Sequence, residues 1–355
     1  NVDMRDPYGS AGIRNPFPPY APVSLDPDAP FVFPMPYAYF QEDWGVGYLQ
    51  SWNLTVEQQL GGDWLVRSAY VGNKGTHLQS FRERNAAVYQ PGATVGNTNA
   101  RRPLAPYFAS MRELVNTGNS VYHSMQITVE KRFSRGFSVL AFYTFSKSID
   151  DESNNAQFTF SNPHPTDQRF NRGVSDFDVR HNFRTSLVYE LPRLDSQHAF
   201  VRTLLGGWNV SSILDWRSGL PFGLTSGRDN SFSGMGLDRA DLTGNPALPS
   251  DRSKDELIAR YFDTSMVTVN AIGTFGNSPR NFLRAPGAFN IDSSLMKDFR
   301  LRENWKIQLR GEFFNLFNNV NLNQPGSNVG APNNFGIITS AGSPRILQVG
   351  ARINF

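Results

Sequence analysis

The sequence contains no cysteine, which excludes disulfide scaffolds, thiolate metal sites and cysteine nucleophiles. It also lacks any run approaching the ~20 consecutive apolar residues that a membrane-spanning helix needs. Hydrophobic residues make up 39% of the chain, and the mean hydropathy of -0.41 is too polar for a bundle of membrane helices. No charged-then-apolar signal segment opens the sequence at Asn1. A helical membrane protein and a disulfide-rich secreted domain are both excluded.

Clusters of charge and recognisable catalytic motifs are also missing. The 34 Lys and Arg residues nearly balance 31 Asp and Glu residues and are scattered, so we expect no nucleic-acid partner. The sequence has no H-E-x-x-H, G-x-S-x-G, P-loop or dinucleotide fingerprint. Its histidines are isolated: His77, His123, His164, His181 and His198. We therefore predict no enzyme activity, no cofactor and no metal site.

Proline and aromatic residues are abundant. Prolines crowd residues 1–43, and an interior strand does not tolerate that density because each proline removes a hydrogen-bond donor from the ladder. Residues 1–43 are predicted to be a loop segment with one short edge strand at most, between Phe31 and Phe40. Because the sequence opens in such a segment, we expect the chain to be a fragment or processed part of a longer protein.

Alternation of apolar and polar residues, the signature of a strand, recurs along residues 44–355. It is clearest in Trp305 to Phe317 and in the last segment, Pro344 to Phe355. In the last segment one face carries Leu347, Val349, Ala351, Ile353 and Phe355. Seven other predicted strands are Tyr48–Leu60, Trp64–Leu78, Val121–Phe133, Phe137–Ser146, Phe177–Leu191, Trp208–Leu220 and Ala288–Phe299.

The connections between these strands alternate between short and long. The longest, Phe222 to Pro286, contains one predicted short helix at Lys254 to Arg260. Outer-membrane barrels have short periplasmic turns, long extracellular loops, apolar residues facing lipid and polar residues facing the lumen. We therefore predict the all-β fold of an antiparallel transmembrane barrel of about 9–10 strands, located in the outer membrane. Lumen-lining candidates are Arg180, Arg184, Lys306, Gln308, Arg310 and Glu312.

Two groups of polar residues leave alternatives open. The run Asp150, Asp151 and Glu152 suits either a calcium or solute site or a solvated extracellular loop, and its spacing favours the loop. His123 and His181 lie on predicted strands, where we expect them to pack in an interfacial belt and not to bind metal.

Several motifs together resemble one family. They are S-W-N-L-T-V-E-Q-Q-L (Ser51 to Leu60), Y-V-G-N-K-G-T-H-L (Tyr70 to Leu78), F-Y-T-F-S-K-S-I-D-D (Phe142 to Asp151), F-G-N-S-P-R-N (Phe275 to Asn281) and R-G-E-F-F-N-L-F-N (Arg310 to Asn318). These are similar to the C-terminal barrel of TonB-dependent receptors of the Oar-like type.

The resemblance implies a receptor or transporter that takes up a bulky nutrient through a 22-stranded barrel. Its implied partners are outer-membrane lipid, the barrel-assembly machinery acting on the last strand, an unknown solute and the TonB complex. The plug and TonB box that contact this complex are not part of the sequence. The alternative is a structural or adhesive surface protein that binds partners through its long loops.

Overall fold

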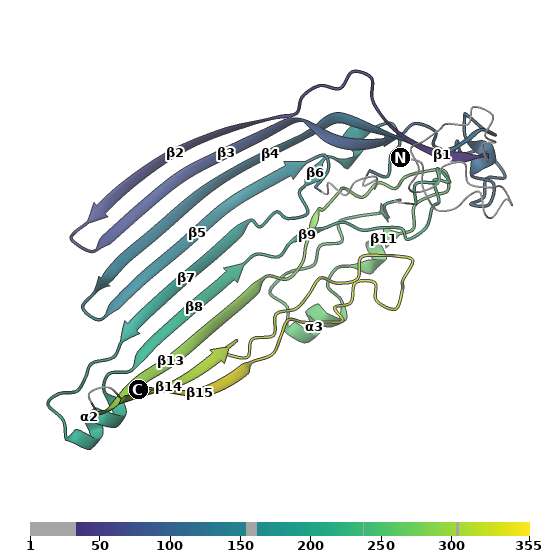
Figure 1. The fold of residues 1–355 in the computed structure, drawn as a ribbon. Coiled ribbons are helices and arrows are strands. Elements are labelled where there is room, and N and C mark those ends of the chain that lie inside the picture. Colours follow the sequence, from purple (N-terminus) through teal and green to yellow (C-terminus); the bar gives the residue numbers. More distant parts are fainter. Residues whose placement is uncertain (1–32, 154–161, 237, 303–304) are drawn as a thin grey trace, which may run out of the picture.

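The computed structural model describes residues 33–153, 162–236, 238–302 and 305–355. Nine long strands lie side by side in one curved sheet (Figure 1). They are β2 (Tyr48–Leu60), β3 (Trp64–Glu83), β4 (Phe108–Ser134), β5 (Phe137–Asp150), β7 (His181–Glu190), β8 (Asn209–Arg217), β13 (Ala288–Arg302), β14 (Trp305–Phe314) and β15 (Ile346–Asn354).

The strands form an antiparallel meander in which each long strand pairs with the next one along the chain. All nine correspond to predicted strands, so the antiparallel all-β prediction is confirmed. Short connections and the helix α2 (Ala199–Leu205) lie at one end of the sheet, and the long loops lie at the other (Figure 1). No helix in the described part of the chain is long and apolar enough to cross a membrane.

The strand register gives the sheet two chemically different faces. Directly paired residues share a face, and Leu54, Tyr70 and Met125 form one such row across β2, β3 and β4. This outward face is mostly apolar. The opposite, inward face carries Arg184 and Asp215 as direct partners, and segments of the long loops fold over it. The separation is what a barrel wall between lipid and a wet lumen requires.

Aromatic side chains form a row at each end of the outward face, and the row at the loop end also includes two histidines. The loop-end row contains Trp52, Tyr70, His123, Tyr143, Phe145, His181, Trp216 and Phe289. The turn-end row contains Trp64, Phe137, Tyr189, Trp208, Phe299, Trp305 and Phe355.

Trp208 and Trp216 belong to opposite rows and are eight residues apart. At ~3.3 Å per residue and a tilt of 35–45°, eight residues span roughly 20 Å of membrane thickness. That spacing is close to the ~25 Å apolar band of outer-membrane barrels.

At the loop end, β3 and β4 are longer than the sequence pattern predicts. The predicted loop between Gln79 and Asn119 contains the last residues of β3 and the first twelve of β4, which pair with each other. The strand β1 (Met35–Phe40) pairs with this extension of β4 in a parallel register, so it is not a tenth strand of the meander. Alternation is lost here because polar side chains are satisfied within the protein: the Glu83 carboxylate accepts hydrogen bonds from the backbone N–H groups of Asn85 and Met111.

The long loops were predicted to be irregular, but they pack into a layer with an apolar core of its own. The core contains Phe222, Leu224, Ala240, Phe262, Val267 and Leu283. Its short elements are η1 (Asn99–Arg101), η2 (Gln168–Asn171), β6 (Gly173–Val174), β9 (Pro221–Phe222), β10 (Asp241–Leu242), α3 (Lys254–Ala259), η3 (Thr264–Met266), β11 (Val267–Thr268) and β12 (Leu283–Arg284). Apolar residues scattered over long segments have no period, so pattern analysis could not detect this core. The predicted helix is confirmed as α3.

Candidate functional site

A row of polar residues crosses the inward face of β7, β8 and β13 near the loop end. Arg184 pairs directly with Asp215, and Asp215 pairs with Asn290 on its other side. The Nε of Arg184 donates to Oδ2 of Asp215 at 2.8 Å, and Nη2 donates to the same oxygen at 2.5 Å. Because the Arg184 side chain is largely exposed, this ion pair orients the two groups more than it stabilises the fold.

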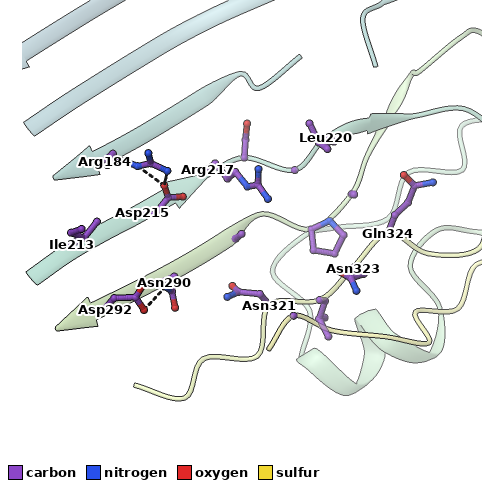
Figure 2. Close-up of a pocket in the computed structure, with 17 residues that line it drawn as sticks. Arg184, Ile213, Asp215, Arg217, Leu220, Asn290, Asp292, Asn321, Asn323 and Gln324 are labelled. Atoms are coloured by element: carbon purple, nitrogen blue, oxygen red, sulfur yellow. Dashed lines mark hydrogen bonds and ion pairs between the residues drawn. The ribbon is translucent and has the colours of Figure 1, made fainter. Parts of the chain in front are cut away.

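These strands and the loops above them line an open cavity of about 600 Å³ (Figure 2). The loop side contributes Asn321, Asn323 and Gln324, and Arg217 enters from the end of β8. Eight of the 17 lining residues carry a guanidinium, a carboxylate or an amide, whereas small-molecule pockets are usually lined mainly by apolar side chains. The cavity therefore suits a solute with many hydrogen-bonding groups.

Three of the cavity's amide side chains already form hydrogen bonds within the protein. Oδ1 of Asn321 accepts from the backbone N–H of Phe289 at 2.8 Å, and Nδ2 of Asn323 donates to Oγ of Ser340 at 2.9 Å. Nδ2 of Asn290 donates to Oδ1 of Asp292 at 2.8 Å. These bonds hold the amides in place while leaving part of each group's capacity for a solute.

Most of the lumen-lining candidates lie on this inward face, lower on the wall. Gln308 donates from Nε2 to Oδ1 of Asp298 at 2.9 Å, and Lys306 lies 3.7 Å from the other oxygen of that carboxylate. Arg310 forms an ion pair with Glu312 on the same strand. Arg180 comes just before the first residue of β7 and is not part of the strand, although it is exposed. The structure brings Arg184 to the cavity and leaves the other candidates outside its lining.

The acidic run at the end of β5 is held by arginines and does not form a solvated loop. Nη1 of Arg280 lies 2.6 Å from Oδ1 of Asp150, and both side chains are less than a tenth exposed. Nη1 of Arg172 lies 2.8 Å from Oδ1 of Asp151. Oε2 of Glu152 accepts from Oγ of Ser80 at 2.7 Å. The prediction of a solvated loop is wrong because arginines replace water around Asp150 and Asp151, and a hydroxyl group does so at Glu152.

Two further arginines connect the loops. Arg284 forms an ion pair with the fully buried Asp178. Arg239 donates to Oδ1 of Asn171 at 2.7 Å and lies over the ring of Phe170. Burial, reinforced by the neighbouring charge of Arg280, lowers the pKa of Arg239 to about 10. These arginines join the loop before β7 to the long loop before β13.

Sequence analysis did not identify these arginines as a group. Arg280 lies in the motif Phe275 to Asn281, but its partner Asp150 is 130 positions earlier and nothing in the spacing connects them. In the part of the chain that the structure describes, no group of three or more His, Asp or Glu side chains is arranged to hold a metal ion.

The two predicted strand histidines contact aromatic rings. Nδ1 of His123 lies 2.8 Å from the hydroxyl of Tyr70, and the His123 ring lies beside Trp52. Nδ1 of His181 lies 2.8 Å from the hydroxyl of Tyr143, with Phe145 and Trp216 close to its ring. The expected packing in a belt is confirmed for both residues.

The terminal strand β15 pairs with β14 through nine consecutive residues and contributes one edge of the described sheet. Its outward residues Leu347, Val349, Ala351 and Ile353 lie opposite Phe313, Gly311, Leu309 and Ile307. The ring of Phe355 lies 5.7 Å from that of Trp305 and is 89% exposed. The chain therefore ends within the turn-end aromatic row.

Comparison with protein families gives one extensive match, since a family model described as "Outer membrane beta barrel domain" matches residues 1–348. No curated protein sequence matches the chain.

Solved structures with a similar fold include three from outer membranes. The outer membrane transporter YddB from Escherichia coli is 11% identical, with a TM-score of 0.47, and the match covers 88% of this chain and 33% of YddB. The FrpB iron transporter from Neisseria meningitidis is 11% identical, with a TM-score of 0.41, and the match covers 90% of this chain and 32% of FrpB. The ferripyoverdine receptor of Pseudomonas aeruginosa is 11% identical, with a TM-score of 0.44, and the match covers 87% of this chain and 27% of the receptor. The chain spans about a third or less of each of these proteins.

Proposed function

The chain belongs to the outer membrane beta barrel domain family, and we propose that it forms the C-terminal part of the barrel wall of a TonB-dependent receptor of the Oar-like type. The receptor would take up a bulky, polar nutrient through the barrel. The observation that carries the proposal is the polar cavity on the inward face, which loop residues cover on one side and beside which Arg284 forms an ion pair with the buried Asp178. A protein located in the outer membrane with a polar, loop-covered lumen is suited to capturing a solute from outside.

Strand direction supports the proposal that more strands complete the wall. Both β2 and β15 run from the loop end to the turn end, since they are the first and last of nine alternating strands (Figure 1). If they paired directly, the closure would be parallel, whereas bacterial outer-membrane barrels are antiparallel with even strand numbers. An odd number of additional strands, placed between β15 and β2, satisfies that rule. We propose residues 44–355 as the barrel portion and residues 1–43 as the loop segment that leads into it.

Binding by the intact receptor tests the uptake proposal. The cavity variants Arg217→Ala and Asn290→Ala are compared with Arg228→Ala, an exposed loop residue outside the cavity. We expect immobilised oligosaccharide and peptide libraries to yield a solute whose binding falls at least 10-fold in the cavity variants and is unchanged in the control. Uptake of the same solute should stop in cells lacking TonB. Solute binding that all three variants retain would contradict a role for the cavity.

The second candidate, an adhesive surface protein, is favoured by the independent core of the loop layer. Buried Phe222, Leu224 and Phe262 stabilise this layer as a folded unit on the barrel, as a protein-binding surface would require. Adhesion that continues without TonB and without the cavity residues would favour this function.

A further inference from the structure

The outward face of the nine strands carries charge of only one sign. Among its described positions between the two aromatic rows and at their edges, there is no Asp or Glu, and the charged side chains are Lys74, Lys131, Lys147 and Lys297. Carboxylates on the strands, such as Glu57, Asp215 and Glu312, lie on the inward face. Charged groups facing lipid are costly unless they reach a polar partner, so each lysine needs an explanation.

The two lysines at the turn end are satisfied inside the protein. Nζ of Lys131 donates to the carbonyl oxygens of Ser134 and Phe137 at 2.9 and 3.0 Å, and lies 3.8 Å from the centre of the Phe137 ring. Nζ of Lys297 donates to the carbonyl oxygen of Gly206 and lies near the rings of Trp208 and Phe299. Both lysines are 5% exposed. Their charges are occupied by backbone carbonyls and aromatic faces.

The two lysines at the loop end are in the opposite situation. Lys74 and Lys147 are exposed, and neither has an ion-pair partner among the residues that the structure describes. The first carboxylate beyond Lys147 on its strand, Asp150, is buried against Arg280, and the next one, Asp151, is paired with Arg172. The positive charge of this lysine pair is therefore not neutralised within the described protein.

The register places the two lysines around His123. Lys147 lies directly opposite His123, and Lys74 lies one outward position beyond Gly72, the partner of His123 on β3. The lysines thus flank β4 from β3 and β5, about 12 Å apart across two strand spacings and two residues along the strands. Both long side chains can reach one group between them. The hydroxyl of Tyr70, which lies 2.8 Å from Nδ1 of His123, belongs to the same patch.

We propose that Lys74, His123 and Lys147 form a binding site for the phosphate of an anionic lipid headgroup in the outer leaflet. The patch is at the loop end, which faces the cell exterior in outer-membrane barrels, and it coincides with the aromatic row that marks the headgroup level. Lysine binds phosphate as a point charge, and the described strand positions of the outward face include no carboxylate that would oppose the anion. This site faces lipid, so it is independent of the proposed transport function, which uses the other face.

Binding of a phosphorylated lipid to the intact protein tests the site. The protein is reconstituted in phosphatidylcholine nanodiscs, and lipid A, a diphosphorylated glucosamine lipid, is titrated into them. We expect the double variant Lys74→Gln with Lys147→Gln to bind lipid A about 30-fold more weakly, because each cation near a lipid surface contributes ~1 kcal/mol. The control, Arg228→Gln with Lys254→Gln, removes the same charge from exposed positions of the loop layer and should bind normally.

Two further arms identify the recognised group. Enzymatically dephosphorylated lipid A should bind the wild-type protein and the double variant equally weakly, and free inorganic phosphate should not compete at millimolar concentration. Equal binding of lipid A by the double variant and the control would overturn the proposal, as would undiminished binding of the dephosphorylated lipid. If free phosphate competes efficiently, the patch binds soluble anions and is not a lipid site. All variants must show the same heat-modifiable gel mobility, so that a loss of binding is not a loss of folding.

Discussion

Arg280 and Asp150 form a buried ion pair, 2.6 Å from Nη1 to Oδ1, between residues 130 positions apart. Asp150 is the last residue of β5, and Arg280 lies in the loop before β13. Arg280 also donates to Oγ of Ser153 at 2.7 Å and to Oδ1 of Asp176 at 3.0 Å. A single guanidinium therefore joins the end of a barrel strand to two of the long loops.

Removing this guanidinium should loosen the loop layer without unfolding the sheet. In Arg280→Met, Asp150 becomes a buried charge without its cation, and losing one partner of such a pair costs about 3–5 kcal/mol. We expect faster hydrogen exchange and proteolysis in residues 162–180 and 270–287, while the strands keep their protection. The matched control is Arg228→Met, which removes an exposed arginine from the same loop.

A double substitution separates the ion pair from other roles of Arg280. If the pair acts as a unit, Arg280→Met combined with Asp150→Leu should cost clearly less than the sum of the single variants, because no buried charge is left unpaired. Additive effects would mean that the bonds from Arg280 to Ser153 and Asp176 hold the loops instead.

Asp238 should make the stability of the loop layer depend on pH. Burial is the main cause that raises the pKa of its carboxyl group above the ordinary 3.8, although hydrogen bonds from Ser231 and Asn270 oppose the shift. Because the folded state then binds more protons at Asp238 than the unfolded state, the contribution of this residue to stability is highest below pH 3.8 and falls as pH rises through the raised pKa. Asp238→Asn should flatten this slope in hydrogen-exchange measurements across the acidic range. If Asp238→Asn leaves the slope unchanged, other groups cause the pH dependence. The exposed Asp251→Asn serves as the control.

The sequence predicted the strands well because a barrel wall imposes alternation at every residue between the aromatic rows. Trp305 to Phe313 illustrates this, since each outward residue there faces an outward partner on β13 or β15. The strand at Phe108 to Asn119 was not predicted. Strand pairing continues there beyond the membrane, and both faces of the strand are polar or covered by other parts of the protein. Alternation reports a difference between two environments, so it disappears where the environments become alike.

The candidate site was only partly predictable for a related reason. Arg184 was recognised because it lies on a regular strand, so its facing follows from period two. Asn321 and Gln324, which complete the cavity, come from a loop whose position over β13 depends on contacts such as Asn321 with Phe289. Arg280, Arg284 and Arg239 are likewise defined by partners far away in sequence. Single-sequence patterns contain no information on such long-range pairings.

Neighbouring positions on β14 should respond oppositely to a new charge. Leu309 faces outward opposite Lys297 and Ala351, so Leu309→Arg places a cation against lipid at a cost of about 2–4 kcal/mol near the midplane. Gln308 faces inward, where Gln308→Arg remains near Asp298 and should be nearly neutral. The free energy of unfolding in detergent or lipid is measured for both variants. Equal losses of this free energy would mean that both faces of the strand are buried from water.

Labelling of single cysteines should place the two ends of the sheet on opposite sides of the membrane. Arg135 lies in the two-residue turn between β4 and β5, and Arg228 is exposed in the longest loop. A membrane-impermeant maleimide added to intact cells should label Arg228→Cys, whereas Arg135→Cys should react only after the outer membrane is permeabilised. The chain has no native cysteine to confuse the result. Labelling of both positions in intact cells would contradict the barrel topology.

The last residue should matter for assembly more than its area suggests. Phe355 is 89% exposed and contacts Trp305 only at a ring distance of 5.7 Å, so burying its ring in the interface is worth only a few kcal/mol. It nevertheless ends a strand whose outer edge has no partner in the described sheet, and an open edge in lipid leaves backbone groups unsatisfied. We propose that the barrel-assembly machinery captures this edge during insertion. Deleting Phe355 from the intact protein should therefore reduce outer-membrane yield by at least 10-fold.

The matched control for this deletion is Phe200→Ala on α2, which removes another highly exposed phenylalanine at the turn end of the sheet. If exposed aromatic area alone decided assembly, the two variants would lose similar amounts of folded protein. If the end of β15 is recognised as a strand, only the deletion should fail, and Phe355→Trp should restore assembly because it preserves an interfacial aromatic. Outer-membrane yield and heat-modifiable gel mobility measure each case. Normal insertion without Phe355 would show that the chain's last residue has no special role and that β15 is captured through the rest of its edge.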